Sequence, residues 1–318
     1  MAIGALVRLV ETSRDASTLR TAAESLGRIG AGNETAIGAL VRLVETARYE
    51  YTLRKAAESL GRIGAGNEMA IGALVRLVET ARNEYTRWWA AERLGRIDPG
   101  NKTAIGALAR LVETSRDAST LRTAAESLGR IGAGNETVIG ALVRLVETAR
   151  DEYTRREAAE SLGQIDPGNE TAIAALTRLV ETARDEYTRR EAAKRLGRIG
   201  AGNETAIAVL TRLVETARNE YTRWWVAERL GQIDPGNKTA IGALVRLVET
   251  SRDASTLRTA AERLGRIDPG NKTAIGALVR LVETSRDAST LRKAAESLGR
   301  IGAGNEMAIG ALVRLVET

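Results

Sequence analysis

The sequence of 318 residues contains no histidine, no cysteine and no phenylalanine. Without imidazole and thiol side chains it has no zinc finger, thiol nucleophile, serine-protease triad, haem ligand or disulfide. Aromatic residues make up only 3% of the chain, so an ordinary mixed core is disfavoured. Long apolar runs and a signal-peptide pattern are also lacking, because Arg8 already interrupts the first apolar stretch. We therefore expect no membrane span and a cytoplasmic location.

What the chain does contain is one repeated phrase. Ala-Ile-Gly-Ala-Leu-Val-Arg-Leu-Val-Glu-Thr begins at Ala2 and returns, with small changes, every 34 residues. Nine full repeats and a half repeat, residues 308–318, therefore account for the chain. This periodicity predicts a single domain, residues 1–318, rather than the two globular domains that the length would suggest. The full repeats start at residues 2, 36, 70, 104, 138, 172, 206, 240 and 274.

Each repeat is predicted to form two helices. In the first helix Ile3, Leu6, Val7 and Val10 follow the spacing of one apolar helix face, with Leu9 on its flank. The apolar residues of the second helix are predicted to point inward; they are Leu19, Ala22, Ala23, Leu26 and Ile29.

The ends of these helices carry recognisable signals. Asp15 and Asn33 are predicted N-caps, because their side-chain oxygens can accept hydrogen bonds from free backbone N–H groups. Glycine in the segment 30–33 can adopt the left-handed conformation that ends a helix. On the outer surface, Glu24 and Arg28 are predicted to pair one helical turn apart.

A family resemblance follows from the segment Thr-Arg-Arg-Glu-Ala-Ala-Glu-Ser-Leu-Gly-Gln-Ile, residues 154–165, and the segment Ala-Ile-Ala-Ala-Leu, residues 172–176. This pattern resembles the HEAT-like repeats of the phycobilisome-lyase type and is similar to repeat arrays beside signalling NTPases in cyanobacteria. The resemblance implies an all-α, right-handed α-solenoid whose second helices line the concave side. Two departures are that Thr replaces the usual Val, and that Leu replaces the usual Arg in five repeats, as at Leu19 and Leu121.

Variation between repeats concentrates at the start of the second helix. Helical spacing puts Tyr85, Trp89, Glu92 and Arg96 on one face, which the two charged residues mark as exposed to solvent. Tyr and Trp are rigid interface anchors, so we expect this face to bind a protein or peptide. The candidate binding residues are Tyr51, Tyr85, Trp88, Trp89, Tyr153, Tyr187, Tyr221, Trp224 and Trp225.

Other interpretations remain open at this stage. The aromatic rings can simply cover the helix junction on neighbouring Arg stems, and duplication or engineering can copy them into a structural repeat array without a ligand. Nucleic acid is the competing partner, through a column of arginines that begins at Arg8. A parallel column of glutamates begins at Glu11 and the net charge is only +6, which favours a mutually neutralising ladder. No catalytic residue, metal site or cofactor is predicted, because every candidate acid recurs in each repeat.

The last helix predicts self-association. Four apolar residues of this helix are expected to be exposed, whereas their equivalents in the other repeats lie in an internal junction. They are Ile309, Leu312, Leu315 and Val316. We expect the scattering mass to rise with protein concentration as these residues pack against a second molecule. A strict monomer at high concentration in light scattering would contradict this expectation.

Overall fold

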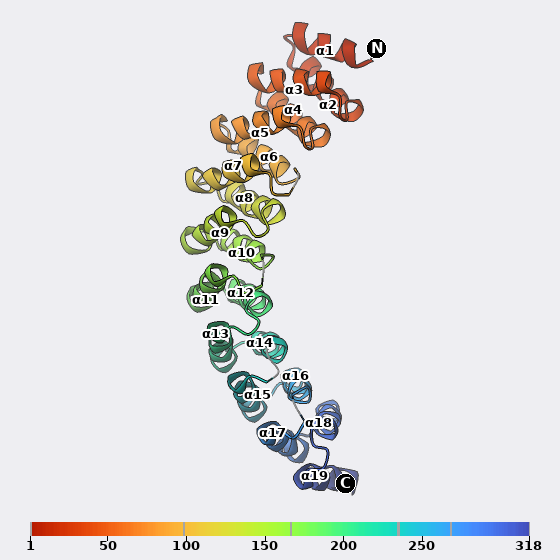
Figure 1. Ribbon diagram of the computed structural model, residues 1–318, viewed down its shortest axis with the longest axis vertical. Helices are drawn as coiled ribbons and strands as arrows, with labels where there is room; N and C mark the ends of the chain where they lie inside the picture. Colours follow the sequence, from red (N-terminus) through yellow and green to blue (C-terminus); the bar gives the residue numbers. More distant parts are fainter. Residues whose placement is uncertain (1, 98, 166, 234–235, 268, 318) are drawn as a thin grey trace. The chain divides into compact units, whose positions relative to one another are not determined.

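The computed structural model describes residues 2–97, 99–165, 167–233, 236–267 and 269–317. Within these ranges the chain forms α-helices and no strand, which confirms the all-α prediction (Figure 1). The helices group into two compact units, Met1–Asp166 and Pro167–Thr318. In each unit the first helices of successive repeats form one layer and the second helices form the other (Figure 1). The single domain expected from the sequence stays a prediction.

In the first unit, helices of the same layer begin at 34-residue intervals from α2 onward. The first-helix layer consists of α1 (Ala2–Thr12), α3 (Glu34–Thr46), α5 (Glu68–Thr80), α7 (Lys102–Thr114) and α9 (Glu136–Thr148). The second-helix layer consists of α2 (Ala16–Ile29), α4 (Glu50–Ile63), α6 (Glu84–Leu94), α8 (Ala118–Ile131) and α10 (Glu152–Leu162).

The second unit has the same two layers. Its first helices are α11 (Glu170–Thr182), α13 (Glu204–Thr216), α15 (Lys238–Thr250), α17 (Lys272–Thr284) and α19 (Glu306–Glu317). Its second helices are α12 (Glu186–Ile199), α14 (Glu220–Ile233), α16 (Ala254–Leu264) and α18 (Ala288–Ile301).

The predicted caps are confirmed. Asp15 accepts a hydrogen bond from the backbone N–H of Thr18 at 2.7 Å, and Asn33 accepts one from Ala36 at 3.0 Å. The left-handed residue of the turn is Gly32, with φ of 67°, whereas Gly30 caps α2 with φ of −96°. A residue with a side chain would be strained at Gly32, so the turn between repeats requires glycine there.

Burial differs from the prediction at two places in the first repeat. Leu43, the equivalent of Leu9, is fully buried in α3, because neighbouring first helices cover it from both sides, whereas Leu9 itself is 42% exposed. Ile29 was predicted to point inward but is 49% exposed. The reason is that its equivalent Ile63 packs beside Gly30 of the preceding repeat, and no preceding helix pair covers Ile29.

The last helix, α19, also differs in part. Ile309 and Val316 are exposed as predicted, at 52% and 87%. Leu312 and Leu315, which were predicted to be exposed, are half-buried because α17 and α18 contact α19 from one side. The predicted self-association through this helix stays a prediction.

Successive second helices approach each other closely through glycine. A Cβ atom added at Gly129 of α8 would lie 2.6 Å from Oγ and 3.2 Å from Cα of Ser161 in α10. The Ser161 hydroxyl uses this proximity to donate a hydrogen bond to the carbonyl of Ala125 at 3.0 Å. Both groups are buried, so the bond satisfies polar atoms that water cannot reach.

A row of buried threonines adds a second link between the same helices. Thr154 is fully buried, and its one hydroxyl hydrogen faces two acceptors, the capping carboxylate of Asp151 at 2.8 Å and the carbonyl of Ala118, one repeat back, at 3.2 Å. Thr120 contacts the carbonyl of Glu84 in the same way at 3.3 Å. The Thr that departs from the family pattern thus brings a hydroxyl to the N-cap of its own helix and to the preceding repeat, which Val cannot do.

The close contact at Gly129 yields a stability test. Gly129→Ala forces a methyl group against the backbone of α10, and overpacking of this kind costs about 1–3 kcal/mol. Gly140→Ala is the matched control, because this helical glycine of α9 has nothing within 4 Å of an added Cβ. Alanine there should be neutral or stabilise the fold by up to about 1 kcal/mol. Urea unfolding monitored by circular dichroism measures both, and equal midpoints for the two variants would contradict the proposed contact.

Candidate functional site

The candidate residues all lie near the start of second helices. Tyr85 follows the N-cap Asn83, whose side chain accepts a hydrogen bond from the Tyr85 backbone N–H at 2.8 Å. This cap sets the start of α6 and therefore the face on which Tyr85 and the two following tryptophans lie. The five tyrosines are between 46% and 57% exposed, and the four tryptophans are half-buried.

In the first unit three of these rings form a cluster on α6. Tyr85 and Trp88 are stacked, with centroids 5.7 Å apart and planes 3° from parallel. Trp89 meets Trp88 edge to face at 4.9 Å and Tyr85 at 6.3 Å. These are the geometries that aromatic pairs prefer, so the three rings support one another as a rigid surface.

The second unit repeats this cluster on α14. Tyr221 and Trp224 are stacked at 5.6 Å with 16° between their planes. Trp225 meets Trp224 edge to face at 5.2 Å. The same sequence thus gives the same arrangement in two different units. Tyr221 and Trp224 also line a shallow cavity of about 370 Å³ with Asp253, Ser255 and Arg258.

Arginine side chains lie over several of these rings, although they were not among the candidate residues predicted from the sequence. The guanidinium of Arg54 lies over Tyr51 at 4.1 Å and over Tyr85 at 5.3 Å. Arg190 lies over Tyr187 at 4.7 Å and over Tyr221 at 4.8 Å. The sequence does contain one indication of their role: Trp88 and Trp224 occupy the helix position that holds Arg in the other repeats. Trp and Arg can replace each other there because both side chains present a flat surface to a ring.

The remaining candidate tyrosine, Tyr153 of α10, has a similar neighbour. Arg156 lies over its ring at 4.3 Å. The rings therefore pack on Arg side chains, as predicted by the alternative interpretation in which the rings only cover the helix junction. Their exposure nevertheless leaves about half of each tyrosine surface accessible to a partner.

The arginine column of the first helices has a different environment. Arginines of this column contact a glutamate of the preceding repeat, as Arg42 does with Glu11 at 2.8 Å and Arg212 does with Glu181 at 2.9 Å. These side chains are exposed, so each pair contributes at most about 1 kcal/mol. The ladder therefore neutralises the column charge along the first-helix layer.

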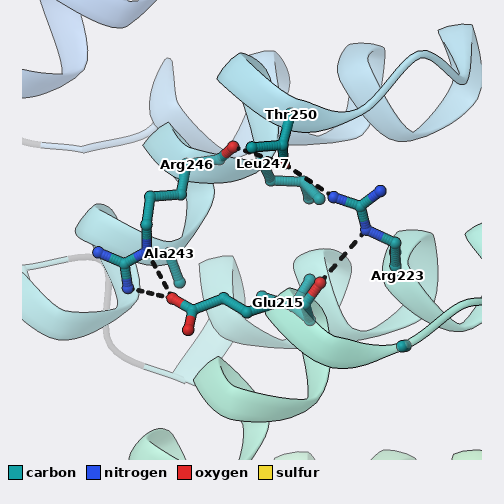
Figure 2. A pocket seen from close by; sticks show the side chains of 8 residues that line it. Glu215, Arg223, Ala243, Arg246, Leu247 and Thr250 are labelled. Atoms are coloured by element: carbon teal, nitrogen blue, oxygen red, sulfur yellow. Dashed lines mark hydrogen bonds and ion pairs between the residues drawn. The ribbon is translucent and has the colours of Figure 1, made fainter.

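Between first helices of the second unit lies a cavity of about 420 Å³ whose polar groups pair with one another (Figure 2). Arg223 donates to the carbonyl of Val214 at 3.3 Å and to Thr250 Oγ1 at 2.9 Å, while Arg246 pairs with Glu215. Arg223 thus links α14 to the end of α13 and to α15. This arrangement braces consecutive repeats, and it leaves few free donors for a ligand.

One carboxyl group on the second-helix layer is perturbed. Glu157 of α10 occupies the helix position that holds Trp89 in α6. Burial raises the pKa of Glu157, and the nearby carboxylates of Glu126 and Glu160 raise it further, against the lowering effect of Arg156 and Arg122. The described residues contain no group of three or more acidic side chains placed to hold a metal ion. Among the described helices none is long and apolar enough to cross a membrane.

Comparison with known proteins identifies the repeat type. A profile described as HEAT repeats matches residues 46–129, 108–197 and 179–265. A search of curated proteins found no significant match. Together with the helical stacks, the profile match confirms the predicted HEAT-like solenoid.

Two solved structures are similar in fold. The X-ray structure of the Escherichia coli protein YibA is 18% identical, with a TM-score of 0.54, over 91% of this chain and 99% of that one. A homology model of the full-length AP-3 complex in an intermediate open conformation contains a chain that is 14% identical, with a TM-score of 0.64. The similarity covers 99% of this chain and 64% of the AP-3 chain, so the protein spans less than two thirds of that relative.

Glu157 provides a pH test. A folded-state pKa above the unfolded value means that stability is lost as pH rises from the ordinary value of 4.5 through the folded pKa. Glu157→Gln should therefore raise the melting temperature at pH 7, and the gain should vanish in acid, where wild-type Glu157 is protonated in both states. Glu191→Gln is the matched control at the same repeat position, because Glu191 is paired with Lys194 at 3.7 Å and its replacement should give no gain. If calorimetry shows that Glu157→Gln changes the melting temperature equally at pH 7 and in acid, this account is wrong.

Proposed function

Because the chain belongs to the HEAT repeat family, we propose that it is a non-catalytic scaffold whose second-helix layer binds a protein or peptide. The observation that carries this proposal is the exposed row of aromatic rings at the start of the second helices. Aromatic rings held rigidly at a surface lose little entropy on binding and bury a large area, which is why they dominate interfaces.

The geometry of the clusters supports the proposal. Trp88 and Trp89 meet edge to face, so the two rings hold each other in place. The indoles are half-buried against the protein, and the tyrosine beside them is exposed. A fixed, partly apolar surface with a polar rim is typical of an interface centre.

The relatives support it at the level of the fold. One similar structure is a chain of the AP-3 complex, and a chain of a complex has protein partners. The concave position that the family resemblance implies for these helices, the lyase-type and cyanobacterial relationship, and the cytoplasmic location stay predictions. So do the engineered origin and the structural array without a ligand.

Nucleic-acid binding remains the second candidate. The first-helix column offers little support for it, because its arginines pair with glutamates of the preceding repeat. The arginines that lie over tyrosine rings on the second helices are the observation in its favour, since stacked rings and cations also bind single strands. A direct binding comparison separates the two candidates.

The experiment begins with selection of peptides from a displayed random library on the immobilised full-length protein. Trp89→Ala combined with Trp225→Ala should weaken binding of the selected peptides by roughly 30-fold or more, because loss of two anchors exceeds about 2 kcal/mol. Fluorescence anisotropy gives the dissociation constants. Melting curves check that the variant remains folded.

The matched control is Leu9→Ala combined with Val316→Ala, which removes exposed apolar side chains from first helices. It should leave peptide affinity unchanged. If no peptide is selected, or if the selected peptides bind the tryptophan variant as tightly as the wild type, the proposed function is wrong.

A further inference from the structure

Two arginines on the second-helix layer are held differently from the others. Arg54 lies over Tyr51 and Tyr85, one ring on its own helix and one on the next, and Arg190 lies in the same way over Tyr187 and Tyr221. Both side chains are half-buried. In the described part of the chain, neither guanidinium is paired with a carboxylate, unlike the arginines of the first-helix ladder.

The carboxylates near Arg54 are engaged elsewhere. Glu50 accepts the hydroxyl hydrogen bond of Thr86. Glu58 pairs with Lys55 at 2.9 Å and with Arg62 at 2.9 Å. Among the described residues of its own unit, these contacts leave the donors of Arg54 without an acidic partner.

The carboxylates near Arg190 are likewise engaged with other groups. Glu186 pairs with Arg189 at 3.1 Å and accepts a hydrogen bond from Thr222 at 2.7 Å. Glu191 is within 3.7 Å of Lys194. Beyond Tyr221 the same row continues with Trp224 and Trp225, and Lys194 lies over the Trp225 ring at 5.2 Å.

A guanidinium over an aromatic ring uses its flat surface for the ring, while its five N–H donors lie in its own plane. The two rings restrict its rotation, so less side-chain entropy is lost when an anion binds. An in-plane pair of N–H donors matches a carboxylate, which accepts both hydrogen bonds. The geometry therefore describes an arginine prepared to receive an external carboxylate.

We infer that Arg54 and Arg190 are carboxylate receptors and that the partner of this face is an acidic, extended peptide segment. The inference rests on the proposed function and names the chemistry of its ligand. In each unit a carboxylate of such a segment binds the arginine, and an apolar side chain of the same segment contacts the tryptophan pair of that unit, Trp88–Trp89 or Trp224–Trp225.

The distance between neighbouring second helices determines which residues of the peptide contact successive repeats. Packed helices lie about 8–10 Å apart, and an extended chain rises about 3.3 Å per residue. Neighbouring repeats therefore contact every third residue of the segment. In each unit an arginine receptor is followed, one repeat on, by a tryptophan pair.

Charge on the face favours a peptide over a nucleic acid. Carboxylates such as Glu58 and Glu92 lie between the cations of α4 and α6, each paired with a cation at 2.6–3.0 Å. A single strand carries a phosphate at every nucleotide and would bring charges against these groups. A peptide can instead put uncharged residues there.

The test measures anisotropy of a labelled peptide of repeated Glu-Ser-Ser-Leu-Ser-Ser units, which places a leucine three residues after each glutamate, on the full-length protein. Arg54→Gln combined with Arg190→Gln should weaken binding about tenfold or more, because charge-assisted bidentate hydrogen bonds are lost. Arg76→Gln combined with Arg212→Gln makes the same charge change in both units on the first-helix layer, and should leave binding nearly unchanged. Replacing Glu by Gln in the peptide should remove the difference between wild type and the Arg54/Arg190 variant.

The other outcomes are decisive in different ways. Equal losses in the two arginine variants would mean that overall charge attracts the peptide, and the inference would be overturned. Tighter binding of single-stranded oligothymidylate than of the peptide, with the same dependence on Arg54 and Arg190, would assign the receptors to phosphate instead. Peptides that bind through the tryptophans without needing Glu would overturn the carboxylate receptors and leave the proposed function intact. Melting curves of each variant exclude unfolding as the cause.

Discussion

The distance between successive second helices is the constraint on which the rest of each unit depends. It is short because a glycine of one helix faces the next helix without a side chain, as Gly129 faces Ser161 and Gly61 faces Arg93. Buried serine hydroxyls such as that of Ser161 then donate to a backbone carbonyl one repeat back. Because a wrong register would leave these buried hydroxyls without acceptors, the bonds fix both the spacing and the alignment of the helices.

The functional face follows from the same spacing. Arg54 can lie over Tyr51 on its own helix and over Tyr85 on the next only if the two helices are close and in register. The aromatic clusters use the same position, with Trp88 replacing the arginine as the flat partner of Tyr85. The close approach of second helices at their glycines, as at Gly61 and Gly197, therefore determines which side chains meet at the exposed surface.

Most of the fold could be predicted from the sequence, because the features involved are local. Caps such as Asp15 and Asn33 and the period of 34 residues depend on neighbours within one or two helical turns. The contacts between repeats join residues 27 to 36 positions apart, and their partners depend on the stacking geometry. The replacement of Val by Thr was visible in the sequence, but its hydrogen bond to the preceding helix was not. For the same reason the aromatic residues were selected as candidates, while Arg54 and Arg190, which connect them, were not.

The two layers of each unit are joined by different forces, and this has a mechanical consequence. Exposed ion pairs such as Arg42–Glu11 join the first helices, and dissolved salt screens them over about 8–10 Å. Buried hydroxyl bonds and glycine contacts join the second helices and are shielded from salt. Rising ionic strength therefore weakens the ion pairs of the first-helix layer, while the apolar contacts that bury Leu43 in that layer and the hydroxyl bonds of the other layer persist. Within each unit we expect the first-helix layer to be the one whose spacing responds to the ionic medium.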